Sequence, residues 1–283
     1  AQGTTRATID NADVDAGSLA VTALGDSTIS STAVAASLSI AGGGVGLSGA
    51  GTGAVSQNLM SNFVAASIVG SDVDTTASGG VVVSASDQSD IDADVVSVSV
   101  SLAAAGGAAL SVSIAVSEAK VDYSTQTLAH LDDSAVTAGL GDVRLTALST
   151  GSIDVNTVAA AVSFAGSGGL SLTGSGTGAI ATVTSSSVTE ASIFGGSEVD
   201  ALSGSLVVDS DVETLITTNA VAVSVAFSIA GGISGSAGAS VTMVDVDFNG
   251  SVLASIDASS ATASGDVVVT ADSTTTSNAT TTS

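Results

Sequence analysis

The feature that most constrains this chain is a repeat of about 62 residues. A short block that begins Ala-x-Ile or Ala-x-Leu recurs, with its apolar third residue at Ile9, Ile68, Leu131, Ile193 and Ile256. A second block, such as GSLAVTA or GDVVVTA, follows each one with a shared apolar position at Val21, Val83, Leu145, Val208 and Val269. A third anchor recurs at Ile29, Ile91, Ile153 and Ile216. Three anchors with nearly one spacing predict stacked units that together bury faces which no unit can bury alone.

Each unit continues into a long run in which bulky and small residues alternate. In the fourth copy one face carries Val221, Val223, Val225, Phe227 and Ile229, and the other face carries Ala222, Ser224, Ala226, Ser228 and Ala230. A period of two predicts strands, and the small face would let a neighbouring layer approach closely. A glycine pair interrupts each run, at Gly42-Gly43, Gly106-Gly107, Gly168-Gly169 and Gly231-Gly232. Glycine accepts positive φ without penalty, so we expect a tight corner between two strands at each pair.

These patterns predict an all-β fold with about four strands in each unit. We favour a β-solenoid (β-helix) of stacked 62-residue repeats, with one or two coils per unit, over a linear array of small β-sandwich or hairpin modules. Because no Pro-rich or charged spacer breaks the series, we expect a single repeat domain over 1–283. Its approximate units are 7–65, 66–128, 129–190, 191–253 and the partial unit 254–283. The unfinished last unit leads us to expect that the parent protein continues.

Composition excludes several classes of function. Only 2% of the residues are aromatic, and there is no Pro, Cys or Trp, so the core must be a regular lattice of small side chains. Three Lys and Arg residues stand against 27 Asp and Glu, a formal net charge of −24. Nucleic acid is therefore an unsuitable partner, because phosphate binding requires clustered cations. Membrane insertion is not expected either, because Ser, Thr and Gly recur every few residues within the long uncharged stretches.

The sequence also gives no sign of catalysis. His130, the only histidine, lies near Asp132 and Asp133 but occupies the repeat position that holds Ser67 and Ser192 in other units. The G-x-S-x-G nucleophile motif does not occur, and the aromatic and basic residues typical of polysaccharide sites are scarce. We therefore predict that the chain is not an enzyme and that His130 is a tolerated surface variant.

Acidic residues recur in two bands. The first band comprises Asp10, Asp13, Asp15, Asp72, Asp74, Asp132, Asp133, Glu198, Asp200 and Asp257, and the second comprises Asp87, Asp90, Asp92, Asp94, Asp154, Asp209, Asp211 and Glu213. Stacked coils would align such residues into ladders that a hard cation could bridge through oxygen ligands. We name as candidate weak Ca²⁺ ligands Asp72, Asp74, Asp90, Asp92, Asp94, Asp132, Asp133, Glu198 and Asp200. The alternative is a solvated face that opposes aggregation. Neither GGxGxD nor a D-x-D-x-D-G loop is present, and no other cofactor is expected.

The order of the blocks, from ASIxxSxVxA through GDVVVTA to the alternating Gly-rich run, resembles the degenerate repeats of very large secreted bacterial proteins. These include filamentous-haemagglutinin-like and leukotoxin-type filamentous adhesins. The resemblance implies an extracellular or cell-surface location and a structural role in a fibre, stalk or filament. A scaffold region of a large adhesin with its binding tip elsewhere is the alternative. A Thr-rich ice-binding β-solenoid, suggested by residues 272–283, is a further one. The expected partners are other copies of the repeat, along or between rods.

Overall fold

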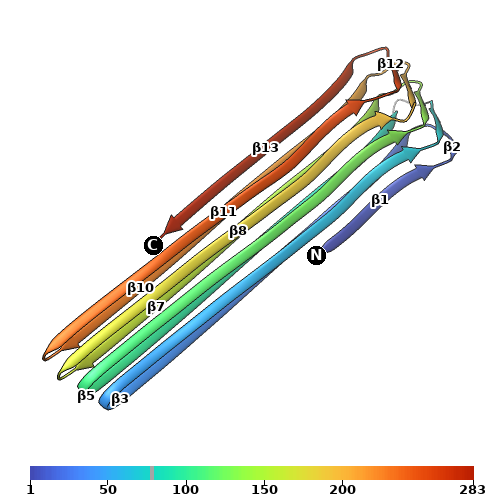
Figure 1. The fold of residues 1–283 in the computed structure, drawn as a ribbon. Coiled ribbons are helices and arrows are strands. Elements are labelled where there is room, and N and C mark those ends of the chain that lie inside the picture. The colour runs from blue at the N-terminus through green and yellow to red at the C-terminus, as the bar shows by residue number, and fades with distance from the viewer. Residues whose placement is uncertain (77–79) are drawn as a thin grey trace.

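The computed structural model describes residues 1–76 and 80–283, and shows a flat stack of parallel β coils (Figure 1). Each complete coil has two long arms that lie against one another. The arms meet at a narrow end, here called the tip, and a short third strand joins them at the opposite end, here called the cap. The strands are β1 (Gln2–Asp10), β2 (Asp13–Ala16), β3 (Leu19–Val69), β4 (Asp72–Thr75), β5 (Val81–Asp132), β6 (Ala135–Ala138), β7 (Val143–Ser167), β8 (Leu170–Phe194), β9 (Glu198–Ala201), β10 (Leu206–Ala230), β11 (Ile233–Ile256), β12 (Ser260–Ala263) and β13 (Val267–Thr282).

Four coils are complete in both arms. In the first and second coils a single strand, β3 or β5, runs through the tip and supplies both arms, whereas the third coil uses β7 and β8 and the fourth uses β10 and β11. β1 and β13 are single arms at the two ends of the stack. The short strands form their own sheet in the order β12-β9-β6-β4-β2. Every pairing between coils is parallel.

The register confirms the β-solenoid and fixes one coil per repeat. Val21 pairs with Val83, Val83 pairs with Leu145, and Leu145 pairs with Val208, so the anchors of successive units lie directly above one another. An array of separate sandwich modules does not fit, because strands of neighbouring units hydrogen-bond to each other along their whole length. At about 3.3 Å per residue, an arm of 25 residues is roughly 80 Å long, whereas each coil adds only about 4.8 Å to the stack. The four coils therefore form a broad blade.

The expectation of four strands per unit is wrong, because a coil has only two arms and one short strand. The two arms are separate strands in the third and fourth coils and one continuous strand in the first and second. The GDVVV block and the alternating run after it form one strand, as in β10, and the second arm runs without a break into the Ala-x-Ile block, as in β8. The short third strand was missed. It lies in the acidic segment directly after the Ala-x-Ile block, as β4 (DVDT) does.

The tip glycines do form the predicted corner, but for a different reason from the one expected. Among them only Gly43 has positive φ, at 138°. A Cβ added to Gly168 would lie 2.5 Å from the carbonyl oxygen of Gly106 in the coil below, and one added to Gly231 would lie 2.6 Å from that of Gly168. At the corners of the third and fourth coils glycine is therefore required, because these corners lie too close to the corner of the coil below for a side chain.

The left-handed conformation is instead a feature of the cap. There the backbone leaves the second arm through a residue of positive φ in each coil, at Asn11, Gly70, Asp133, Gly195 and Ala258. Asn, Asp and Gly adopt this conformation more readily than other residues. A serine next to this turn links the coils, since the hydroxyl of Ser134 accepts a hydrogen bond from the backbone N–H of Ser71 at 3.2 Å and donates one to the carbonyl of Asp132 at 2.8 Å.

The interior changes character along the arms. Near the cap, where the third strand holds the arms apart, it is built from branched aliphatic residues such as Val83, Leu145 and Ile193, all fully buried. Towards the tip it consists mainly of Ala, Ser and Thr, as at Ala159, Ala161 and Thr173. The predicted alternation is confirmed, and the small face does receive a neighbouring layer, which is the other arm of the same coil.

Serine hydroxyls join the two arms across this narrow interior. The hydroxyl of Ser113 donates to the carbonyl and hydroxyl oxygens of Ser99 at 2.8 and 2.9 Å. The hydroxyl of Ser111 donates to that of Ser101 at 2.8 Å, and Ser101 in turn donates to Ser48 of the first coil at 2.9 Å. The hydrogen bonds therefore run both across a coil and between coils, and they satisfy polar groups that would be costly to bury alone.

Candidate functional surfaces

The outer face of the first arms, here called the first-arm face, is formed by β7, β10 and the first halves of β3 and β5. It divides into two halves of opposite chemistry. The half near the cap, here called the acidic half, carries outward carboxylates at Asp26, Asp90, Asp92, Asp94, Asp154, Asp209, Asp211 and Glu213. Beyond the row Thr32-Asp94-Asn156-Asn219 the outward residues are uncharged to the tip. Two members of that row bond directly, since the amide of Asn219 donates to the Oδ1 of Asn156 at 3.0 Å.

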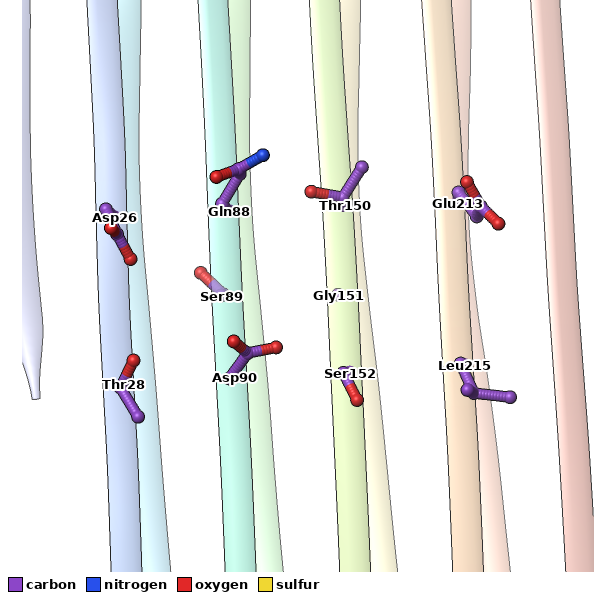
Figure 2. A pocket seen from close by; sticks show the side chains of 10 residues that line it. All are labelled: Asp26, Thr28, Gln88, Ser89, Asp90, Thr150, Gly151, Ser152, Glu213 and Leu215. Atoms are coloured by element: carbon purple, nitrogen blue, oxygen red, sulfur yellow. The ribbon is translucent and has the colours of Figure 1, made fainter.

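The acidic half contains a shallow groove of about 500 Å³ (Figure 2). Thr150 and Ser152 on β7 lie along its middle, with Gln88 and Asp90 on one side and Glu213 on the other. The groove follows from side-chain size, because β7 carries shorter residues here than either neighbour. Its carboxylates lie on different coils and are separated by hydroxyl side chains.

The structure only partly aligns the predicted acidic ladders. Asp13 lies beside Asp72, and Asp15 beside Asp74, but the next coil has Ala135 and Thr137 at these positions, which separate the pair from Glu198 and Asp200. Asp92 lies beside Asp154, whereas Asp90 lies beside Ser152 and Asp94 beside Asn156. Asp132 and Asp133 lie at the cap turn, outside the row of Asp72 and Asp74. No group of three candidate ligands that could hold a metal ion occurs within residues 1–76 and 80–283. Binding of Ca²⁺ therefore stays a prediction.

Two carboxyls in these rows show the effect of crowding. Desolvation raises the pKa of Asp154, and the like charges of Asp92 and Asp94 raise it further. The pKa of Asp211 is also raised, first by desolvation and then by repulsion from Asp209, Asp272 and Glu213. The acidic half therefore holds charges that repel one another, which screening by cations would relieve.

Asp87 differs from the other members of its predicted band because it points into the blade. It is fully buried and accepts a hydrogen bond from the hydroxyl of Ser89 at 2.8 Å and another from the amide of Asn62 at 3.3 Å. Burial raises its pKa, and the two hydrogen bonds partly oppose this. The period of two could have shown this position, since Asp87 shares parity with the buried residues Val83 and Ala85.

His130 lies where the repeat predicts, between Ser67 and Ser192 of the neighbouring coils. Its Nε2 is 3.7 Å from the Oε1 of Glu190, and its ring meets Phe194 edge-on at 5.4 Å between centroids. Burial lowers the pKa of His130, and the charges of Glu190 and Asp132 oppose that shift. Its surroundings are thus an acid and an aromatic ring.

The uncharged half of the first-arm face, here called the apolar tip face, was not recognised from the sequence. It presents rows of bulky residues, of which Val162, Val223, Val225, Phe227 and Ile229 are 40–53% exposed. Phe164 and Phe227 stack on adjacent coils with centroids 5.7 Å apart. The outer face of the second arms is also apolar near the tip but is uneven. There a groove of about 340 Å³ passes over Gly174 and Gly176.

Comparisons with known proteins add no relative. No family model, no curated protein and no solved structure matches the chain. In the part of the chain that the structure describes, no helix is long and apolar enough to cross a membrane.

Proposed function

We propose that this chain is a non-catalytic structural segment of an extracellular bacterial fibre or filament, in which coils stack along one axis. The observation that carries the proposal is the shared register of the coils, which shifts at a bulge between Gly43 and Val45 at the tip of the first coil but holds along both arms. Every coil places the same anchors above one another, and successive coils are built from equivalent arms and turns. A scaffold is the function that such repetition supports best.

The two ends of the stack favour continuation. Within residues 1–76 and 80–283, β1 pairs only with β3, and β13 pairs only with β10. Each end thus presents a row of backbone donors and acceptors that a further coil could join. More coils, in the same chain or another copy, are the natural occupants of these edges.

The dimensions agree with the resemblance to very large proteins. About 62 residues add only about 4.8 Å of length, so a long filament of this kind needs either a giant chain or many copies. Each coil instead contributes the length of its arms, about 80 Å, to the width of the filament. We therefore propose a ribbon and not a thin stalk. The acidic surface and the absence of cysteine are compatible with an exported, soluble ribbon. The same geometry would serve a scaffold region of an adhesin.

The Thr-rich segment does not favour ice binding. A flat threonine array requires the same residues on successive coils, but Thr274 lies beside Glu213 and Thr276 beside Leu215. The row therefore does not continue to the neighbouring coil.

Extension of the stack tests the proposal. A chain in which residues 66–253 are repeated in register should gain three coils, so small-angle scattering should show a blade of unchanged width, about 80 Å, that is about 14 Å thicker along the stack. Its melting temperature should be higher, because each coil adds an interface with its neighbour. The matched control repeats the same residues with a flexible Gly/Ser linker of about 30 residues between the copies. If the in-register chain also behaves as two independent particles, axial stacking is not the function.

A further inference from the structure

We propose that the apolar tip face is a contact surface for a second copy of this chain. The two blades overlap tip half on tip half, related by a two-fold axis, and their acidic halves point in opposite directions. This contact lies between blades, on a different surface from the axial edges of the proposed filament.

The first argument is the extent of the apolar surface. Its columns run Val34-Val96-Val158-Val221, Leu38-Val100-Val162-Val225 and Ile40-Leu102-Phe164-Phe227 across the four coils. Four strands at about 4.8 Å and nine residues at about 3.3 Å give roughly 570 Å² on one blade. That is at the upper end of the largest patch expected on an ordinary monomer, about 300–600 Å². It consists of uncharged residues, mostly Val, Ile, Leu and Phe with some Ala and Gly, and a patch of this size often marks an interaction surface.

The second argument is that the area is sufficient for a dimer. Two such faces pressed together remove about 1,100 Å², above the roughly 1,000 Å² expected of a specific interface. Branched side chains on two flat sheets interdigitate at a separation of about 10 Å, as in β-sandwiches. Such a contact between blades would bury the bulky residues at the tip, which the narrow interior of the blade cannot accommodate.

The third argument is charge, which selects both the partner orientation and the face. If the two blades pointed the same way, full overlap of their first-arm faces would press the acidic halves together, and if they pointed opposite ways it would press each acidic half onto the partner's apolar tip face. Overlap of the tip halves alone brings no charge into contact. The second-arm face is less suitable. Glu118 points outward beside its apolar rows, with Lys120 and Asp122 following on the same strand, and its glycines leave gaps.

Sedimentation velocity of the full chain tests the proposal. We expect a species of twice the 26.5 kDa chain mass. Val162→Lys should weaken this dimer about tenfold or more, because it would bury an unpaired charge at the contact. Two matched controls should keep the wild-type mass: Ser152→Lys, on the same strand and face but in the acidic half, and Ile114→Lys, in the tip half of the opposite face. Val225→Lys repeats the test on the fourth coil, and circular dichroism melts establish that each variant is folded.

The shape of the dimer separates this contact from axial stacking. Tip-to-tip overlap gives a particle about 130 Å long by scattering, whereas two blades stacked along the axis stay about 80 Å wide. A monomeric wild type, or a dimer that Val162→Lys leaves intact, overturns the lateral contact. The second result would leave the axial proposal standing. A monomer that floats with neutral phosphatidylcholine vesicles, and loses this binding in Val162→Lys, would also overturn the proposal, by assigning the face to lipid.

Discussion

The cap half and the tip half of a coil share one alternating pattern, but the large apolar residues point inward near the cap and outward near the tip. Near the cap, Leu145 and Ile193 lie inside, and carboxylates such as Asp92 lie outside. Near the tip, Ala161 and Ser113 lie inside, and Val225 and Phe227 lie outside. At the tip, therefore, side-chain size and not hydrophobicity decides which face is buried.

The cause is the separation of the arms. At the cap a third strand closes a triangle, and its own Val73, Val136 and Val199 help to fill the space. At the tip a glycine corner joins the arms directly, so only small residues such as Ala, Ser, Gly and Thr fit between them. The larger residues of the alternating run are thereby placed on the surface, where they form the proposed contact.

The largest effect should come from emptying the cap core. Leu145→Ala removes a fully buried side chain and should lower the free energy of unfolding by about 2–5 kcal/mol in chemical denaturation. The matched change at the tip, Val225→Ala, removes an exposed side chain and should alter the monomer by less than about 0.5 kcal/mol. Equal losses at both sites would mean that the two halves do not differ in this way.

Filling the tip interior is the converse experiment. Ala161→Leu forces a large residue between closely packed arms and should destabilise the fold by about 1–3 kcal/mol or prevent folding. Ala160→Leu, at the next residue on the outer face, adds the same atoms where there is room. If denaturation curves for the two variants coincide, the interior at the tip is wider than the structure shows.

The serine network should contribute less. Ser113→Ala deletes a donor to Ser99 and should lower the free energy of unfolding by about 1 kcal/mol. Ser124→Ala, on the outer face of the same strand, is the control and should have little effect. A neutral Ser113→Ala would indicate that close packing of small groups, without hydrogen bonding, holds the arms together at the tip.

Much of this fold could be predicted from the sequence because stacking repeats the same residues at the same place. The anchor at Val83 and its equivalents fixed the period, and the run after Ile216 fixed the strand type. Which of the two alternating faces lies inside could not be predicted. The pattern at Val223 and Ala222 shows that there are two faces but not which one the second arm covers. That depends on the distance between arms, which only the three-dimensional coil sets.

The acidic candidates show a similar limit. The bands were visible, but their alignment depends on whether each member faces outward and on its exact register. A shift of one position separates Asp87, which is buried, from its outward neighbour Gln88. Asp132 lies at a turn beside Val69 rather than above Asp72. Residue type and approximate spacing therefore predicted the acidic surface but not its rows.

Low pH should stabilise the fold through the buried carboxyl of Asp87. Burial raises the pKa of Asp87 above its unfolded value, so its contribution is fully present below the unfolded pKa of about 3.9 and is lost as the pH rises through the folded pKa. Asp87→Asn should thus raise the melting temperature by a few degrees at pH 7 and less at pH 4. Asp90→Asn removes the same charge from the outer face. An identical pH profile for the two variants would assign the effect to net charge alone.

The smallest effect should be that of divalent cations, and it should be confined to the acidic half. Asp92 and Asp154 lie side by side on adjacent coils, and their mutual repulsion favours any cation between them. Millimolar Ca²⁺ should therefore raise the melting temperature slightly more than NaCl of equal ionic strength. Asp154→Asn should remove this excess. The tip variant Val162→Lys should retain it, because the cation-responsive carboxylates lie in the other half of the arm. Equal melting temperatures in calcium, chelator and matched salt would exclude even weak bridging, and would leave the acidic half a purely solvated surface that keeps neighbouring blades apart.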